Sequence, residues 1–304
     1  MEGEGERKPR RLPAIAFICP DGHPIKFQHC FNACRLDRRC ATLAYLRLIS
    51  YQREWRGVTP SMAGNGPRLE YLKKTVPYCI DPQDRAFAAL GTGVHGKLSI
   101  HAYTENILAE EPLSDQQTKG IPDCLEVDEQ SVNSYVLTDY KTWGSYKVRK
   151  ALGMVSKEVP LLDDNGTPTF YVKGKKKGQP KTTKQWTIDC SAIDMKDTEL
   201  QLNRYRILFE QSGFHISRMQ VQAILRDGGT INAINNGLTK NFYLVDVPFM
   251  DNQVVLSYYK HLQEDIQAAE NFNWIRKCND WESWNGVRCE RYCEVYYACE
   301  QMKP

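Results

Sequence analysis

The chain has 304 residues, of which 41% are hydrophobic and 25% charged, a composition typical of a globular protein with a full core. We find no apolar run long enough to span a membrane, and residues 1–13 lack the apolar core of a secretory signal, so the sequence predicts a cytoplasmic protein. The formal net charge of +3 is too small by itself to indicate a nucleic-acid partner.

The first 45 residues combine a basic tail with four cysteines. Residues 1–14 are polar and basic, which indicates a flexible tail, with a contact to a nucleic-acid backbone as the alternative. Residues 15–45 hold four cysteines separated by ten, three and five residues: Cys19, Cys30, Cys34 and Cys40. Thiolates bind soft or borderline metals, and four of them complete either a tetrahedral zinc site or an iron–sulfur cluster.

Apolar residues then recur at helical spacing. The pattern predicts helices at 41–55, 68–75 and 84–104. The third helix carries His95, shortly after Gly91-Thr92. A lone histidine on a helix is usually structural. The acidic residues that follow make this one a candidate metal ligand through one ring nitrogen.

Two acidic residues and a lysine stand at the ends of predicted strands. Short apolar runs predict strands at 107–112, 122–128 and 134–141. Asp123 closes a Gly-x-x-Asp turn at the start of the second strand, and Asp139 and Lys141 stand at the end of the third. Because alternate residues of a strand point the same way, the side chains of Asp139 and Lys141 should enter one site near Asp123. Two carboxylates and the backbone carbonyl of Tyr140 suit Mg²⁺ or Mn²⁺.

The next segment indicates a basic insertion. A helix is predicted at 144–152, and 160–186 is predicted to be an inserted hairpin with a turn at Asp164-Asn165-Gly166. Its second arm holds a cluster of five lysines: Lys173, Lys175, Lys176, Lys177 and Lys181. Taken alone, this loop is as compatible with a solvated surface as with contacts to a DNA backbone.

The last third of the chain ends in a second cysteine segment. It is predicted to contain helices and strands at 197–212, 216–226, 242–247 and 251–270. Gln201 and Tyr205 lie four residues apart on the first of these helices and therefore share a face. Residues 271–304 hold four cysteines with the same gaps of ten, three and five residues: Cys278, Cys289, Cys293 and Cys299.

The repeated spacing favours two separate metal sites. In each quartet, the two cysteines separated by three residues lie one helical turn from each other, so short helices should present them. The remaining cysteines are better explained as small buried hydrophobes: Cys79, Cys124 and Cys190.

The order of the motifs resembles the PD-(D/E)xK nuclease superfamily. Pro122-Asp123 and Asp139-Tyr140-Lys141 match the two halves of its pattern. The segment Gly91-Thr92-Gly93-Val94-His95 looks like the Gly-Thr-x-x-His motif of the RecB-type branch, and Gln201-Leu202-Asn203-Arg204-Tyr205 looks like its Gln-x-x-x-Tyr helix. Iron–sulfur members of that branch, the AddB-type helicase-nuclease subunits and the CRISPR-adaptation exonucleases, also carry a C-terminal cysteine cluster.

The cysteine pattern matches those members only in part. They use one cysteine before the nuclease motifs and three after them, with final gaps of two and five residues. Cys293 and Cys299 reproduce the gap of five, whereas Cys289 departs by one residue. The comparison leaves open a second arrangement, in which one N-terminal cysteine joins the C-terminal trio and the others are spare.

The resemblance implies an α/β fold with a restriction-endonuclease-like core, in which a central mixed sheet is flanked by helices and cysteine-rich metal-binding segments lie at both termini. It implies a metal-dependent DNA nuclease, most simply an exonuclease acting on ends or single strands in DNA repair, recombination, or phage or CRISPR DNA processing. The implied cofactors are Mg²⁺ or Mn²⁺ and, at the cysteines, a [4Fe-4S] cluster or Zn²⁺. A helicase, recombination or CRISPR-adaptation protein is the implied partner, and the lysine cluster would contact DNA.

The same resemblance implies a role for each site residue. The divalent cation would be held by His95, Asp123, Asp139 and the carbonyl of Tyr140. Lys141 would position or deprotonate the attacking water. Gln201 and Tyr205 would position the substrate strand.

These features divide the chain into a tail at 1–14, an N-terminal four-cysteine segment at 15–45, a nuclease core at 46–270 and a C-terminal four-cysteine segment at 271–304. Three other functions stay open: a structure-selective endonuclease, a non-catalytic DNA-binding module on a nuclease scaffold, and a zinc-finger-type interaction protein. The intact Asp-x-Lys pair argues against the second. A cleavage assay combined with metal analysis separates all of them.

Overall fold

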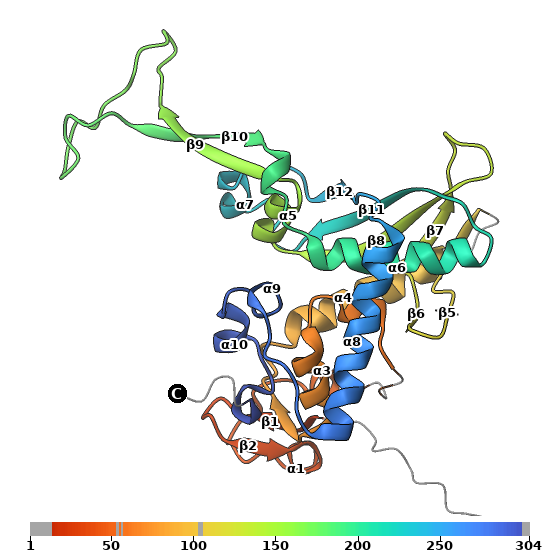
Figure 1. Cartoon of the computed structure of the whole chain (residues 1–304). Helices are drawn as coiled ribbons and strands as arrows, with labels where there is room; N and C mark the ends of the chain where they lie inside the picture. Colours follow the sequence, from red (N-terminus) through yellow and green to blue (C-terminus); the bar gives the residue numbers. More distant parts are fainter. Residues whose placement is uncertain (1–13, 53–54, 56, 103–105, 300–304) are drawn as a thin grey trace, which may run out of the picture. The chain divides into compact units, whose positions relative to one another are not determined.

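The computed structural model describes residues 14–52, 55, 57–102 and 106–299. The chain forms two compact units, each built from segments far apart in the sequence (Figure 1). The first unit takes in Met1–Asp139, Lys196–Met219 and Val247–Pro304, and the second takes in Tyr140–Met195 and Gln220–Asp246. All but the last residue of the tail predicted at 1–14 lies outside the described residues.

A small sheet begins the first unit. Its strands are β1 (Ala14–Ile18), β2 (Pro24–Lys26) and β3 (Tyr78–Ile80), in the order β2-β1-β3. β1 pairs with β2 antiparallel and with β3 parallel, so the sheet is mixed. The expectation that 107–112 forms the first strand is therefore wrong. Two of these strands have only three residues, too few for a period-two pattern to be recognised in the sequence.

Four helices of the first unit lie in its N-terminal part: α1 (Phe27–Asn32), α2 (Leu43–Ser50), α3 (Gly66–Thr75) and α4 (Ala86–His101). Helix α2 is shorter than the predicted 41–55. Thr42 caps its start by accepting a hydrogen bond from the amide of Tyr45, and the extended backbone at Tyr51 ends it. Helices α3 and α4 lie within three residues of their predicted ranges.

Both cysteine segments contribute to one hydrophobic core of the first unit. Phe17 from β1 and Leu46 from α2 are buried there together with Val295 and Cys299. Full burial of one large apolar side chain stabilises a fold by roughly 1.5–3 kcal/mol. Apolar packing therefore holds the two cysteine segments in the same unit.

A second core of this unit forms around the long helix α8 (Asn252–Phe272). The carboxylate of Asp251 caps the helix by accepting hydrogen bonds from two backbone amides of its first turn. One stripe of the helix is buried: Val255, Tyr259, Leu262 and Ile266. Helix α8 runs beside α3 and also contacts α6 (Lys196–Gln211), which carries the predicted Gln201 and Tyr205 (Figure 1).

Five strands are hydrogen-bonded in the order β12-β11-β8-β7-β4. They are β4 (Ile107–Ala109), β7 (Cys124–Val127), β8 (Tyr135–Trp143), β11 (Ile216–Leu225) and β12 (Phe242–Asp246). Neighbours β4–β7, β7–β8 and β11–β12 are antiparallel. The predicted strands at 122–128, 134–141, 216–226 and 242–247 correspond to four of these, and the first predicted strand ends at Ala109 rather than at residue 112.

β8 and β11 are parallel to each other. The amide of Tyr135 donates to the carbonyl of His215 where the two strands begin, at 2.9 Å. Where they end, the amide of Arg226 donates to the carbonyl of Trp143, also at 2.9 Å. Bonds that join start to start and end to end require parallel strands. The sheet is therefore mixed.

The second unit contains an extended hairpin. Its strands β9 (Met154–Pro160) and β10 (Thr182–Ile188) pair antiparallel over seven residues, so the hairpin begins six residues before the predicted 160. Helix α5 (Ser145–Ala151) precedes it, close to the predicted 144–152, and a short helix α7 (Ile231–Asn235) completes the unit. The turn expected at residues 164–166 is present, with the amide of Gly166 donating to the carbonyl of Asp163.

The C-terminal cysteine segment forms two short helices, α9 (Asp280–Ser283) and α10 (Val287–Arg291). Helix α9 starts with a capping box, in which Asn279 and Glu282 bind each other's backbone amides. The described chain is thus a mixed α/β protein with mixed sheets flanked by helices. None of the helices in its described ranges is long and apolar enough to cross a membrane.

Candidate functional site

The two predicted carboxylates lie on adjoining strands, with Asp123 directly before β7 and Asp139 inside β8. The prediction that Asp139 and Lys141 end their strand is wrong, because β8 continues to Trp143. Cys124 on β7 pairs with Thr138 on β8, so the next residue on each antiparallel strand, Asp123 and Asp139, continues that pairing at the edge of the ladder. The Asp139 side chain is 3% exposed. Burial of a carboxylate requires compensating partners. The strand pairing thus places a buried acid beside a second acid that is more exposed.

Helix α4 brings His95 to the first carboxylate. Nδ1 of His95 lies 3.1 Å from Oδ1 of Asp123, within hydrogen-bonding distance. The two residues are 28 positions apart in the sequence, and His95 is half-buried. The whole Gly91–His95 motif lies inside α4. The contact joins the histidine of one predicted motif to the aspartate of another.

Helix α6 brings two further predicted residues to the carboxylates. Nε2 of Gln201 donates to Oδ1 of Asp139 at 3.1 Å, and the Tyr205 hydroxyl donates to the carbonyl of Ile121 at 3.3 Å. Burial raises the pKa of Tyr205 well above its usual range, and the negative charges of Asp139 and then Asp123 raise it further. Tyr205 therefore stays a neutral hydrogen-bond donor next to both acids.

Lys141 and Tyr140 follow Asp139 in strand β8. The strand is continuous from Tyr135 to Trp143, so its alternation puts Asp139 and Lys141 on the same face. Both Lys141 and Tyr140 are half-buried. The unit boundary falls between Asp139 and Tyr140, so the acid belongs to the first unit and the lysine to the second.

Gly120, the first residue of the Gly-x-x-Asp turn, lies against the ring of Tyr205. It ends the two-stranded hairpin formed by β5 (Leu113–Ser114) and β6 (Lys119–Gly120). A Cβ atom at this position would lie 2.5 Å from Cε1 of Tyr205 and 2.9 Å from Cδ of Pro60. Only glycine lets the Tyr205 ring pack this closely against the strand that leads to Asp123.

We expect Gly120→Ala to displace the Tyr205 ring and destabilise the chain by about 1–3 kcal/mol, as overpacked sites do. Chemical denaturation of both proteins would measure the loss. Gly93→Ala is the matched control, because a Cβ there meets no atom within 4 Å and alanine favours the helix. Equal stability of wild type and Gly120→Ala would show that the ring does not need this space.

An ion pair that the sequence did not predict joins α6 to the β5–β6 turn at a position between Gln201 and Tyr205. Arg204 is fully buried, and its Nη2 donates to Oδ2 of Asp115 in the β5–β6 turn. Its guanidinium carbon also lies 5.9 Å from the centroid of the Tyr259 ring. The backbone amides of Gln117 and Thr118 donate to Asp115 at 2.9 Å each. These contacts hold the ion pair in place at the residue that directly precedes Tyr205.

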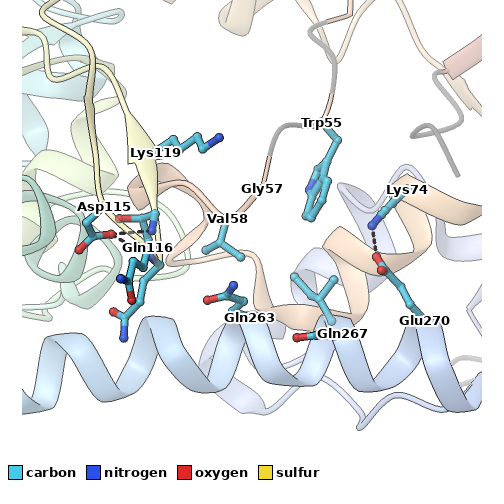
Figure 2. Close-up of a pocket in the computed structure, with 13 residues that line it drawn as sticks. Trp55, Gly57, Val58, Lys74, Asp115, Gln116, Lys119, Gln263, Gln267 and Glu270 are labelled. Atoms are coloured by element: carbon cyan, nitrogen blue, oxygen red, sulfur yellow. Dashed lines mark hydrogen bonds and ion pairs between the residues drawn. The ribbon is translucent and has the colours of Figure 1, made fainter. Parts of the chain in front are cut away.

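A pocket of the first unit begins at the same turn (Figure 2). Asp115 and its neighbours form one end, and the ion pair between Lys74 and Glu270 forms the other. Nζ of Lys74 lies 4.0 Å from the centroid of the Trp55 ring. The residues that line this pocket include none of the predicted site residues.

The donor set at the carboxylates has the chemistry that a hard divalent cation requires, with two carboxylates and an imidazole. Across residues 14–52, 55, 57–102 and 106–299, however, we find no three His, Cys, Asp or Glu side chains in an arrangement that could hold a metal ion. The histidine instead contacts Asp123, and Gln201 contacts Asp139. A cation would therefore have to compete with these contacts.

The four N-terminal cysteines influence one another's charge, although no three of them are arranged to hold a metal ion among the described residues. Cys19 follows β1, Cys30 lies in α1, and Cys34 and Cys40 come after that helix. Burial raises the pKa of the Cys30 thiol, and the charges that Cys19, Cys40 and Cys34 would carry raise it further. Arg39 donates to the carbonyl of Cys30 at 2.6 Å and so ties the following loop to the helix.

The C-terminal cysteines form a second such group. Burial raises the pKa of Cys278 to about 11, with further contributions from Glu282 and from the other three thiols of the quartet. As in the first quartet, the second cysteine lies in a short helix, here α10, and the third comes two residues after the helix ends. The prediction that a helix presents both of these cysteines is therefore wrong. The repeat in spacing is nevertheless matched by a repeat in local structure.

The lysine cluster lies on the hairpin of the second unit. All five side chains are exposed or half-exposed there: Lys173, Lys175, Lys176, Lys177 and Lys181. Among the three cysteines expected to be buried, Cys124 is buried, Cys79 is half-buried and Cys190 is exposed, so that prediction is wrong for Cys190.

No protein-family model matches the chain, and a comparison with curated proteins found no similar sequence. The candidate site therefore has to be interpreted from its own residues. Five of the predicted residues converge in the first unit: His95, Asp123, Asp139, Gln201 and Tyr205.

Proposed function

We propose that the chain is a divalent-metal-dependent deoxyribonuclease with a restriction-endonuclease-like core. One observation carries the proposal: His95 contacts Asp123, Gln201 contacts Asp139, and the pairing of β7 with β8 places the two acids opposite each other. These residues come from four sequence motifs spread over 111 positions, from residue 95 to residue 205. Their convergence supports the hypothesis that the motifs form one site.

The residues that would hold Mg²⁺ or Mn²⁺ are His95, Asp123, Asp139 and the carbonyl of Tyr140. When bound, the cation lowers the pKa of a coordinated water and neutralises charge that develops on the phosphate.

The remaining residues orient the reacting groups. Lys141, on the same strand face as Asp139, would position the attacking water and stabilise negative charge in the transition state. Gln201 fixes Asp139 through its amide, so the carboxylate is oriented before substrate arrives. Tyr205 stays protonated, and to position the substrate strand its hydroxyl would have to exchange the carbonyl of Ile121 for a phosphate oxygen.

The direct test is a cleavage assay on end-labelled single-stranded and double-stranded DNA. We expect phosphodiester cleavage with Mg²⁺ or Mn²⁺ and none with EDTA. Mononucleotide products released from an end would identify an exonuclease, whereas internal cuts on branched DNA would identify a structure-selective endonuclease. DNA binding without cleavage under any metal condition would identify a non-catalytic DNA-binding module and refute the proposed activity.

We further propose that each cysteine quartet holds its own [4Fe-4S] cluster or Zn²⁺. Support comes from the identical spacing of the four cysteines in each segment and from the shared position of Cys30 and Cys289 in short helices. Because no three of these thiols are arranged to hold a metal among the described residues, binding would have to draw them together. Burial and mutual repulsion disfavour the thiolates, and a bound cation would offset both. The quartets would then stabilise the core that they share.

Cys293→Ser should lower the melting temperature and remove the metal of one quartet only, because metal binding contributes folding free energy. Elemental analysis of anaerobically purified protein, together with thermal unfolding, would measure both effects. Cys190→Ser is the matched control, since Cys190 is exposed and outside the quartets. Full metal content and unchanged melting in Cys293→Ser would contradict the assignment, and loss of metal from both quartets would favour a shared site.

A further inference from the structure

The positive charge of the chain is concentrated in the hairpin of the second unit. Residues 154–188 contain seven lysines and three acidic residues, a net charge of +4, whereas the whole chain carries +3. The rest of the chain is therefore close to neutral. From residue 169 to residue 188 there are six lysines and no acidic residue. Such a concentration of positive charge is typical of a surface that binds a polyanion.

The same hairpin exposes large apolar side chains. Exposed fractions are 51% for Phe170, 75% for Val172, 52% for Leu162 and 71% for Ile188. Folding alone does not account for these residues, because they bury little surface. Apolar groups exposed among positive charges indicate a binding surface with both kinds of contact.

Tyr171 combines the two kinds of group at one position. Its half-buried ring has Nζ of Lys176 at 5.7 Å and Nζ of Lys181 at 5.8 Å from the ring centroid. Further down the hairpin, the Trp186 ring has Nζ of Lys184 at 5.8 Å. Aromatic rings next to ammonium groups suit a single strand of nucleic acid, because its bases can stack on the rings while the lysines contact the phosphates between the bases.

The backbone holds this surface in a defined shape. The amide of Tyr171 donates to the carbonyl of Gln179 at 3.0 Å, and the amide of Lys181 donates to the carbonyl of Thr169 at 2.8 Å. Phe170 forms an isolated bridge with Pro180. The rings and the nearby lysines are thus part of a paired structure beyond β9 and β10.

We propose that residues 161–181 bind single-stranded nucleic acid, with bases stacking on Phe170 and Tyr171 and lysines contacting the adjoining phosphates. The proposal rests on the proposed nuclease function, for which it names the substrate form and a binding element outside the carboxylate site. Single strands are favoured over duplexes because stacking on a protein ring requires an unpaired base. The hairpin contributes affinity for the strand and takes no part in bond cleavage.

The test measures binding of the full chain to a fluorescent oligodeoxythymidylate by anisotropy, in EDTA so that no cleavage occurs. A shortened variant joins Pro160 to Thr182, which face each other in the β9–β10 register, through an Asn-Gly turn. We expect wild type to bind the single strand more tightly than a duplex of equal length. The shortened variant should bind the single strand at least about tenfold more weakly.

Two point variants separate the contributions. Phe170→Ala with Tyr171→Ala should weaken binding about tenfold without changing its salt dependence, because stacking releases no counterions. The triple variant Lys175→Ala, Lys176→Ala and Lys177→Ala should reduce the slope of log affinity against log salt by about 2, at roughly 0.7 per phosphate contact. Phe272→Ala, another exposed ring, and Lys260→Ala are the matched controls and should bind normally.

Wild-type affinity of the shortened variant would overturn the proposal. Equal binding of duplex and single strand would overturn the stacking contact, and hairpin-dependent binding to phosphatidylserine vesicles without binding to the oligonucleotide would assign the surface to a membrane. Failure of this inference can be distinguished from failure of the nuclease proposal. A wild-type chain that binds through the hairpin but never cleaves refutes the nuclease alone, and a hairpin variant that cleaves and binds normally refutes this inference alone.

Discussion

Replacing Asp139 with asparagine should lower the rate of phosphodiester cleavage by about 10²- to 10³-fold while the chain stays folded. Asparagine has the same shape and can still accept the hydrogen bond from Gln201 through its amide oxygen. Asparagine lacks the negative charge that would bind the divalent cation. Without that charge the site would stabilise the transition state less. Initial cleavage rates at saturating Mg²⁺ would measure the effect, and thermal unfolding would confirm the fold.

Asp246→Asn is the matched control for the loss of a carboxylate, because Asp246 is exposed on β12. Its activity should equal that of the wild type. Lys141→Met should show a loss comparable to that of Asp139→Asn, since a charge is removed from the same strand face. Full activity of both Asp139→Asn and Lys141→Met would refute the assignment of this site as catalytic.

The largest effect on stability is expected at Asp115. Replacing it with alanine leaves the guanidinium of Arg204 buried without its carboxylate, and breaking a buried ion pair in this way costs about 3–5 kcal/mol. Equilibrium denaturation in urea would measure the loss. In the double variant Asp115→Ala with Arg204→Met, the stranded charge is removed, so much of the stability should return. A loss below about 1 kcal/mol in Asp115→Ala would mean that the pair is not buried in solution.

The same pair predicts how stability depends on pH. Burial alone would raise the pKa of Asp115, but the hydrogen bonds from Arg204 and from the amides of Thr118 and Gln117 outweigh it and lower the pKa below 3.8. A carboxylate with a lowered pKa in the folded state stabilises the protein above about pH 3.8. That contribution is lost as pH falls through the folded pKa. Asp115→Ala should therefore lose part of the acid dependence seen in wild type.

The long helices and central strands could be predicted from the sequence because their apolar periodicity extends over many residues. Helix α6 and helix α8 were placed within two residues of their observed limits. The sequence did not predict β1, β2 and β3. The strands β2 and β3 have three residues each and carry no periodic signal, and β1 pairs with β3 only after the intervening chain has folded. Strand β1 also contributes Phe17 to a core that it shares with the C-terminal segment.

The site was predictable to the extent that its residues lie in motifs of fixed spacing. Asp139 and Lys141 share a strand face, and Gln201 and Tyr205 share a helix, as their spacing indicated. The support beneath them was not predictable. Arg204 read as an ordinary charged residue of a helix, and only the fold brings it to Asp115, 89 positions earlier. Burial of an arginine cannot be recognised from the residues next to it in the sequence.

Helix α4 differs from the other long helices in that no residue of Ala86–His101 is buried. It contains Gly91, Gly93 and Gly96, each of which costs a helix roughly 1 kcal/mol relative to alanine. Such a helix has a small free energy of local opening. Its side chain His95 contacts Asp123, which precedes β7. In the proposed site, binding of a cation through His95 and formation of helix α4 would be thermodynamically linked. Part of the binding free energy would then be used to order the helix that carries the imidazole.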